Sequence, residues 1–262
     1  MEILSLLKNN FPDKESPYAF RALACLSWMN EKAQNDLRSC DFLNVLVKSI
    51  RKFRENATFI TEASYALCGC FDGHREDTAK ICEESTKDKL ILDILLDAVN
   101  KDPENENLAS KVCLAVGSLA FSGVCHKQLF EEKQYRWKTL ISVYKMHRKH
   151  AETMMWVSFA ISNNLNMWEK SERLQKVEKF SDLTTYLWSD LHLLSSHDQT
   201  CYFMNLMSHL IGLPVMLKKL VDEPSSFEAV FEVCCQFKCE AKYLKTIVPF
   251  QLRITSTPVG DM

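Results

Sequence analysis

Proline is missing from the whole stretch of residues 104–213, although the chain contains 7 prolines. Proline inside a helix removes a backbone hydrogen bond and clashes with the preceding turn, so a long proline-free run permits uninterrupted helices. Glycine is also scarce, with 6 residues in 262. Folds rich in strands and tight turns need more of both residues, because such turns require positive or fixed φ angles. These two scarcities predict an all-α protein.

Two helical patterns alternate along the chain. The first is a helix rich in alanine, cysteine and other small residues, found at residues 22–27, 66–71, 115–120 and 160–165. The second is an apolar amphipathic helix, with starts 48, 47 and 46 residues apart at Phe42, Leu90, Trp137 and Leu183. A single apolar residue between the two patterns recurs at Leu37, Ile81, Leu129 and Leu174. Self-similarity at about 40–47 residues indicates a stack of helical repeat units.

Two glycines occupy nearly equivalent positions in the small-residue helices, Gly69 and Gly117. A glycine in the middle of a helix costs about 1 kcal/mol relative to alanine. That cost is reasonable where two backbones approach closely, so we predict tight contact between neighbouring helices at both positions. Charged stretches at residues 72–77 and 101–106 are typical of surface loops between units.

The repeat divides the chain into four segments. Residues 1–17 are predicted to form an N-terminal capping helix, with breaks before Pro12 and Pro17. Residues 18–195 hold about four clear units. Residues 196–248 are predicted to hold a degenerate unit, with a fifth small-residue helix near residues 201–207, and a C-terminal cap over residues 227–245, because a repeat array needs atypical ends. Residues 249–262 are expected to form a frayed tail.

Composition narrows the class of protein. Apolar residues make up 47% of the chain, charged residues 25%, and the net charge is −2. That charge argues against a general nucleic-acid binder, which usually carries a positive excess. No run of 18 apolar residues is present, so no membrane span is expected, and residues 1–8 lack the apolar core of a secretory leader. The 11 cysteines lie inside apolar helical runs, so we expect free thiols and an intracellular location, cytoplasmic or nuclear.

Three segments resemble the armadillo repeat family. Residues 62–69, Glu-Ala-Ser-Tyr-Ala-Leu-Cys-Gly, are similar to the family's inner-helix pattern of Glu-Ala, an aromatic residue and Ala-Leu-Ser-Asn. Residues 159–163, Phe-Ala-Ile-Ser-Asn, match the last part of that pattern, and residues 41–47 are similar to the segment that opens the family's outer helix. The resemblance covers roughly residues 18–195 and implies a right-handed α-solenoid of armadillo- or HEAT-like repeats.

Armadillo proteins usually bind extended peptides along a concave groove, where inner-helix asparagines hold the peptide backbone and aromatic residues one turn earlier hold its side chains. Carried over by position, the asparagine site falls on Cys25, Gly69, Ser118, Asn163 and Asn205. The aromatic site falls on Arg21, Tyr65, Leu114, Phe159 and Cys201. Most of the asparagine ladder is therefore missing, and the partner contacts that the resemblance implies are Tyr65, Phe159, Asn163 and Asn205.

One cluster of sulfur and nitrogen ligands raises the question of a zinc site. Cys68, Cys70, His74 and Cys82 lie within 15 residues and could supply the ligands of zinc. Their spacing matches no common zinc module. Cys68 and Cys70 are also two apart on a predicted helix, so their side chains should point away from each other. Small buried thiols are therefore the favoured interpretation.

Two further cysteine groups lead to the same interpretation. Cys235 and Cys239, in a cluster with Cys234, share one helical face, but no histidine follows nearby. Cys125 and His126 resemble a nucleophile and its base only superficially, because sequence neighbours on a helix do not face each other. We therefore expect no catalytic, cofactor-binding or metal-binding residue, and no enzyme activity.

Basic residues gather at the ends of two amphipathic helices. One group comprises Lys48, Arg51, Lys52 and Arg54, and the other comprises Lys145, His147, Arg148, Lys149 and His150. Cations at helix C-termini complement the macrodipole, so both groups have a structural explanation. Equivalent helix ends lie along one edge of a repeat stack, so the two groups could also align as a surface for an acidic partner. Trp28 and Trp168 could be exposed interface anchors, although packing between helices is the simpler interpretation.

The function that these patterns predict is a non-catalytic scaffold or adaptor that binds a protein or peptide on its surface. One alternative is regulation of a small GTPase or a kinase through the same surface. A further alternative is a nucleic-acid-handling helical repeat enzyme, against which the net charge argues.

Overall fold

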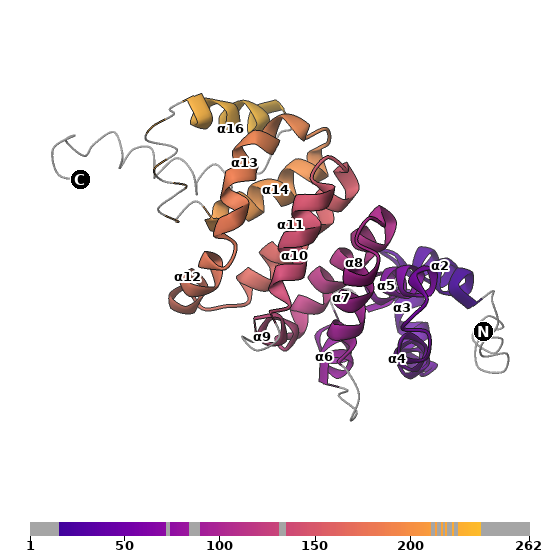
Figure 1. The fold of residues 1–262 in the computed structure, drawn as a ribbon. Helices are drawn as coiled ribbons and strands as arrows, with labels where there is room; N and C mark the ends of the chain where they lie inside the picture. Colours follow the sequence, from indigo (N-terminus) through magenta and orange to yellow (C-terminus); the bar gives the residue numbers. More distant parts are fainter. Residues whose placement is uncertain are drawn as a thin grey trace.

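The computed structural model describes residues 16–71, 74–83, 90–130, 135–210 and 225–236, together with residues 213, 216, 218 and 222. Every regular element in these ranges is a helix, which confirms the all-α prediction. The first of these helices, α2 (Ser16–Ser27), and the last, α16 (Ser225–Gln236), lie at opposite ends of the molecule (Figure 1). Among the described residues, none of the helices has the length and apolar character that a membrane span requires.

Five helices form a central row. They are α2, α5 (Ala57–Phe71), α8 (Glu106–Leu119), α11 (Ala151–Asn166) and α14 (His197–Leu210). Each helix of the row packs against the next, in chain order (Figure 1). These five are the small-residue helices that the sequence predicts, including the fifth near residues 201–207. Helices α5 and α8 bury nearly all their side chains, because a helix inside the row has neighbours on both sides.

Close approach between neighbouring helices explains why glycine occupies two positions in this row. A Cβ atom on Gly69 would lie 2.7 Å from the Ala24 carbonyl oxygen of α2. A Cβ atom on Gly117 would lie 2.3 Å from the Phe159 ring and 3.2 Å from the Ala160 Cα of α11. Both distances are shorter than ordinary van der Waals contact, which confirms the predicted close contact between neighbouring helices.

The amphipathic helices cover one side of the central row. They are α4 (Phe42–Lys52), α7 (Ile91–Lys101), α10 (Trp137–His147) and α13 (Thr184–Asp190), the last preceded by the short 3-10 helix η2 (Ser181–Leu183). Helix α7 packs against both α4 and α10, and α10 packs against η2. All four begin within one residue of the predicted starts, so this part of the prediction is confirmed.

A third, short helix in each unit was missed by the two-pattern description. These helices are α3 (Glu31–Ser39), α6 (Arg75–Glu83), α9 (Cys125–Leu129) and α12 (Lys170–Glu178). The isolated apolar residues Leu37, Ile81 and Leu129 lie on them and are buried, so each anchors its helix to the core. Helices of five to nine residues with one apolar anchor are too short to show a clear 3.6-residue period, and the sequence pattern therefore places them in loops.

A side chain caps the N-terminus of each of the three helices inside the central row, α5, α8 and α11. The Asn56 Oδ1 atom accepts a hydrogen bond from the Phe59 N–H at the start of α5, and Asn105 Oδ1 accepts one from Leu108 N–H at the start of α8. At the start of α11 the His150 Nδ1 atom plays this part. Such side chains satisfy backbone donors that a helix N-terminus leaves without an intrahelical partner.

Polar contacts join each unit to the next. Arg136 Nε donates to Asp93 Oδ1 at 2.5 Å, and the two residues are 43 positions apart in the sequence. The Tyr144 hydroxyl donates to Asp190 Oδ2 at 3.0 Å, across 46 residues. Both contacts connect equivalent parts of successive units, because each spans about one period of the sequence pattern. Burial of apolar side chains and these polar contacts together fix how one unit sits on the next.

The ends of the chain are described only in part. The predicted helix over residues 1–17 lies almost wholly outside the described residues, and Pro17 lies in the first turn of α2, where a missing N–H is tolerated. Helix α16 occupies part of the predicted cap over residues 227–245 and contacts the 3-10 helix η3 (Leu191–Leu193). Residues 237–262, which include the predicted tail over 249–262, lie outside the described part.

Candidate functional site

Aromatic side chains form a surface along the central row, which we call the aromatic face. Its members are Trp28, Tyr65, Trp156, Phe159 and Tyr202. Trp28 is 36% exposed and the other four are partly buried. The rings of Trp28 and Tyr65 are 5.6 Å apart between centroids. Those of Phe159 and Tyr202 are 5.1 Å apart, and Trp156 lies within 5.8 Å of both. Large rings held at a partly open surface are typical anchors of protein interfaces.

Lys111 on α8 connects the two groups of rings. Its Nζ atom lies 5.0 Å from the centroid of the Tyr65 ring on α5. The same ammonium donates a hydrogen bond to Glu152 Oε1 on α11 at 2.6 Å. Glu152 lies one turn before Trp156 on that helix. The aromatic face is therefore continuous from α2 through α8 to α14.

Two acidic side chains on the aromatic face sit in different environments. Burial raises the pKa of Glu62, and the nearby charges of Arg21 and Lys111 only partly oppose this effect. Burial also acts to raise the pKa of Glu152, but the hydrogen bond and charge of Lys111 outweigh it, so the pKa of Glu152 is lowered. Glu152 is thus held as the anionic partner of Lys111.

The asparagines predicted from the resemblance lie beside the aromatic face. Asn163 on α11 and Asn205 on α14 are both partly buried. The Asn163 side-chain amide donates to the Gly117 carbonyl oxygen of α8 at 3.2 Å. At least one amide group of the predicted ladder therefore holds two helices of the row together.

The aromatic face contains residues that the sequence prediction missed. Tyr65 and Phe159 were predicted, but Trp156 and Tyr202 were not. Tyr202 directly follows Cys201, the position carried over from the armadillo pattern, and Trp156 lies one turn before Phe159. Allowing the predicted aromatic position to move by one residue would have found Tyr202, and allowing it to move by one helical turn would have found Trp156.

Three cations of the basic groups at the helix ends pair with acidic side chains. Arg148 forms an ion pair with the fully buried Asp190 and donates from Nε at 3.0 Å, and Lys145 Nζ lies 3.3 Å from Asp182 Oδ2. Arg54 lies 3.8 Å from Glu55. Lys48, Lys52 and Lys149 are exposed, and Arg51 is partly buried.

The two basic groups do lie along one edge, with the end of α7 between them. Lys101, the last residue of α7, pairs with Glu55 after α4 at 2.5 Å. The His147 ring at the end of α10 hydrogen-bonds to the Pro103 carbonyl oxygen at 2.7 Å. Because carboxylates are interspersed among the cations, this edge offers less net positive charge than the sequence pattern indicates.

The four residues of the hypothetical zinc cluster face different partners. Cys68 Sγ lies 3.0 Å from Ser118 Oγ on α8, whereas Cys70 Sγ lies 3.2 Å from Ser27 Oγ at the end of α2. The two thiols thus point to opposite neighbours, as predicted. His74 Nε2 donates to Gln34 on α3. In the part of the chain that the structure describes, no group of three or more histidine, cysteine or acidic side chains is arranged to hold a metal ion.

The adjacent residues Cys125 and His126 face different surroundings. The His126 ring packs edge-on against Trp168, with 4.8 Å between centroids, and burial and the charge of Lys127 lower its pKa. The Cys125 thiol donates to the Val116 carbonyl oxygen at 4.0 Å, away from the His126 ring. Trp168 itself is partly buried and packs on the core, so of the two tryptophans considered as anchors, Trp28 is the more exposed.

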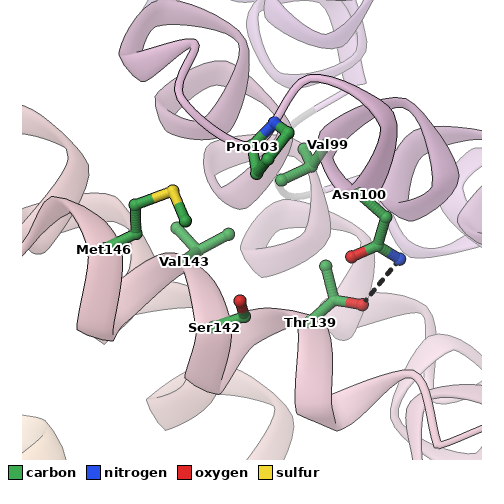
Figure 2. Close-up of a pocket in the computed structure, with 7 residues that line it drawn as sticks. All are labelled: Val99, Asn100, Pro103, Thr139, Ser142, Val143 and Met146. Atoms are coloured by element: carbon green, nitrogen blue, oxygen red, sulfur yellow. Dashed lines mark hydrogen bonds between the residues drawn. The ribbon is translucent and has the colours of Figure 1, made fainter.

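A shallow pocket lies between α7 and α10 (Figure 2). Val99, Pro103, Val143 and Met146 give it an apolar lining, and the Asn100 amide donates to the Thr139 hydroxyl at its rim. Its volume is about 190 Å³, including space open to solvent. Because this figure includes open solvent, the space enclosed by the lining residues is smaller still and well below that of small-molecule sites, so the pocket does not indicate a cofactor or substrate.

Neither a protein family model, nor a curated protein, nor a solved structure matches this chain. The function is therefore inferred from the surfaces of the molecule itself.

His209 on α14 provides a pH-dependent contribution to stability. Burial and the charge of Arg173 lower its pKa to about 4 in the folded protein, from 6.5 for the free side chain. The folded state thus disfavours protonation of His209. Between pH 4 and pH 6.5 the unfolded chain therefore binds more protons at this side chain than the folded chain does. Stability that is complete above pH 6.5 is therefore lost as the pH falls towards 4.

The corresponding prediction compares the wild type with His209→Gln. Between about pH 7.5 and pH 5, the wild type should lose roughly 2 kcal/mol more unfolding free energy than the variant. Urea denaturation at both pH values measures this difference. Equal losses in the two proteins would contradict the assignment of this pH dependence to His209.

Proposed function

We propose that this chain is a non-catalytic, armadillo-like α-solenoid of right-handed repeats that binds an extended segment of a protein partner. The repeated three-helix unit and the contacts between successive units support the solenoid. The ladder-type residues Tyr65, Phe159, Asn163 and Asn205 support the armadillo resemblance, because all four lie on or beside one face of the central row.

The continuous aromatic face carries the proposal for binding. It offers rings that are partly exposed yet held by neighbouring rings. Binding a partner would therefore cost little side-chain conformational entropy. It also offers paired charges, from Lys111 and Glu152, at a position between the two groups of rings. A row of inner helices presents such a face along its length, which suits an extended peptide rather than a small molecule.

A protein partner is favoured over nucleic acid. Carboxylates accompany the cations along the basic edge, and the chain's net charge is −2. Phosphate binding gains its affinity from a surplus of cations that displaces counterions. The free cysteines among the described residues fit a reducing compartment, so we place the protein in the cytoplasm or nucleus.

The test uses peptides selected for binding to the folded chain from a displayed random library. Their dissociation constants are then measured for the wild type and for Trp156→Ala. We expect the variant to bind at least about 10-fold more weakly, because truncating an aromatic anchor removes one of the few residues that dominate an interface. Circular dichroism and the Tm of the variant establish that it remains folded.

The matched control is Lys149→Ala, an exposed substitution on the basic edge. It should leave the dissociation constants unchanged if the aromatic face is the binding surface. If Lys149→Ala weakens binding and Trp156→Ala does not, the basic edge is the functional surface and the proposal is wrong.

A further inference from the structure

Two cysteines from successive units meet in the core. Cys82 is near the end of α6 and Cys125 is the first residue of α9, so they are one repeat period apart. Their side chains are 3% and 0% exposed. The two side chains are close enough to shift each other's pKa, and Ser122 contacts both residues. They therefore come together through the packing of two units, although 42 residues separate them in the sequence.

Ser122 holds both cysteines in place. Its hydroxyl donates to Cys82 Sγ at 3.7 Å. The same oxygen accepts from the backbone N–H of Cys125 at 3.2 Å and from that of Val124 at 3.1 Å. On the other side, the Gln128 side chain donates to the Cys82 carbonyl oxygen at 2.9 Å. Both cysteine backbones are thus tied to the same turn, which limits how far the sulfur atoms can separate.

The two thiols differ in acidity. Interaction with the Cys125 thiol, together with the hydrogen bond from Ser122, lowers the pKa of Cys82 in spite of its burial. The pKa of Cys125 is raised well above its usual value by the same interaction and by burial. Cys82 is therefore the sulfur that more readily becomes a thiolate, and the thiolate is the reactive form of cysteine.

We propose that Cys82 and Cys125 form a redox modification site, in which a hydroperoxide converts the two thiols into a disulfide between α6 and α9. The Cys82 thiolate attacks one peroxide oxygen, the O–O bond breaks, and Cys82 becomes a sulfenic acid. The Cys125 sulfur then attacks the Cys82 sulfur, which forms the S–S bond and expels the hydroxyl group as water with the Cys125 proton. For hydrogen peroxide, two thiols and one peroxide give one disulfide and two waters.

Other buried cysteines provide the comparison. Burial raises the pKa of Cys70 to about 12, although its hydrogen bond with Ser27 opposes this, and burial alone raises the pKa of Cys113. Both are as buried as the proposed pair, so peroxide has no easier access to them or to the pair. A difference in oxidation between the pair and these two thiols therefore reports on the pairing and not on exposure.

The experiment treats the folded full chain with a small excess of hydrogen peroxide. Remaining thiols are alkylated under denaturing conditions, and trypsin digestion without reduction is followed by mass spectrometry. Trypsin releases residues 81–87, which contain Cys82, and residues 112–127, which contain both Cys113 and Cys125. We expect these two peptides to be linked, with the mass of two hydrogens lost, and dithiothreitol to separate them.

Two variants identify the partner of Cys82. The link should persist in Cys113→Ser and disappear in Cys125→Ser, where dimedone should instead trap Cys82 as a sulfenic acid. Fragmentation of the linked wild-type peptides locates the bond without relying on either variant. The proposal fails if the bond maps to Cys113, or if Cys82 remains a thiol, or becomes only over-oxidised, once the exposed Cys25 is fully oxidised.

Discussion

Replacing Asp190 with alanine is expected to destabilise the protein by roughly 3–5 kcal/mol, because the change breaks a buried ion pair and leaves its cation behind. Asp190 is fully buried at the end of α13. It accepts hydrogen bonds from the Tyr144 hydroxyl and from the Arg148 guanidinium, both near the end of α10. Without the carboxylate, a buried hydroxyl and a partly buried charge lose their partner together. Urea denaturation of wild type and variant measures the loss.

The neighbouring pair between Lys145 and Asp182 supplies the control. The Asp182 side chain is 67% exposed, so solvent screens its attraction to Lys145. Asp182→Ala should therefore cost no more than about 1 kcal/mol. The two substitutions remove the same functional group from contacts with the end of α10, one made by α13 and the other by η2. A similar loss of unfolding free energy for both variants would show that burial does not determine the strength of these two contacts.

The second large effect is expected for Gly69→Val, which should destabilise the protein by about 3 kcal/mol. The new Cβ would lie 2.7 Å from the Ala24 carbonyl oxygen, and backbone atoms cannot move aside without shifting α2 away from α5. Thermal unfolding followed by circular dichroism should show a Tm several degrees lower.

Ala22→Val is the matched control, because Ala22 is exposed on α2, the helix that faces Gly69. It also introduces a β-branched side chain into a helix but meets no neighbouring backbone, so its cost should be about 0.5 kcal/mol. Equal Tm values for Gly69→Val and the wild type would mean that the row has room between α2 and α5, contrary to the close approach described above.

Much of the fold could be predicted because small and apolar residues mark the packed helices directly. Gly69 and Gly117 are unfavourable in a helix, so their positions alone indicated where two helices touch. The starts of α4, α7, α10 and α13 could be read from amphipathic periodicity. The short helices α3, α6 and α9 could not, because their stability comes from burying one side chain, such as Leu37 or Ile81, against helices that are distant in sequence.

The candidate site was harder to predict from the sequence, because the character of a surface depends on which of its charged side chains are paired in the fold. Arg148 and Lys145 have the same appearance in the sequence as Lys149, and only the fold brings Asp190 and Asp182 to the first two. The opposite holds for Trp156. Its size predicts burial, but α14 covers only part of it, so it contributes to the aromatic face.

The contacts between units also bear on how the chain reaches its folded state. The hydrogen bonds between units named above span 37 to 50 residues, from the pair Lys145–Asp182 to the pair Cys68–Ser118. Closing a loop of this length costs about 1.5 kcal/mol less free energy than joining the two ends of a 262-residue chain. During synthesis, each unit can therefore acquire its polar partners as soon as the following unit has left the ribosome, and the nascent chain exposes little more than one unfinished interface at a time.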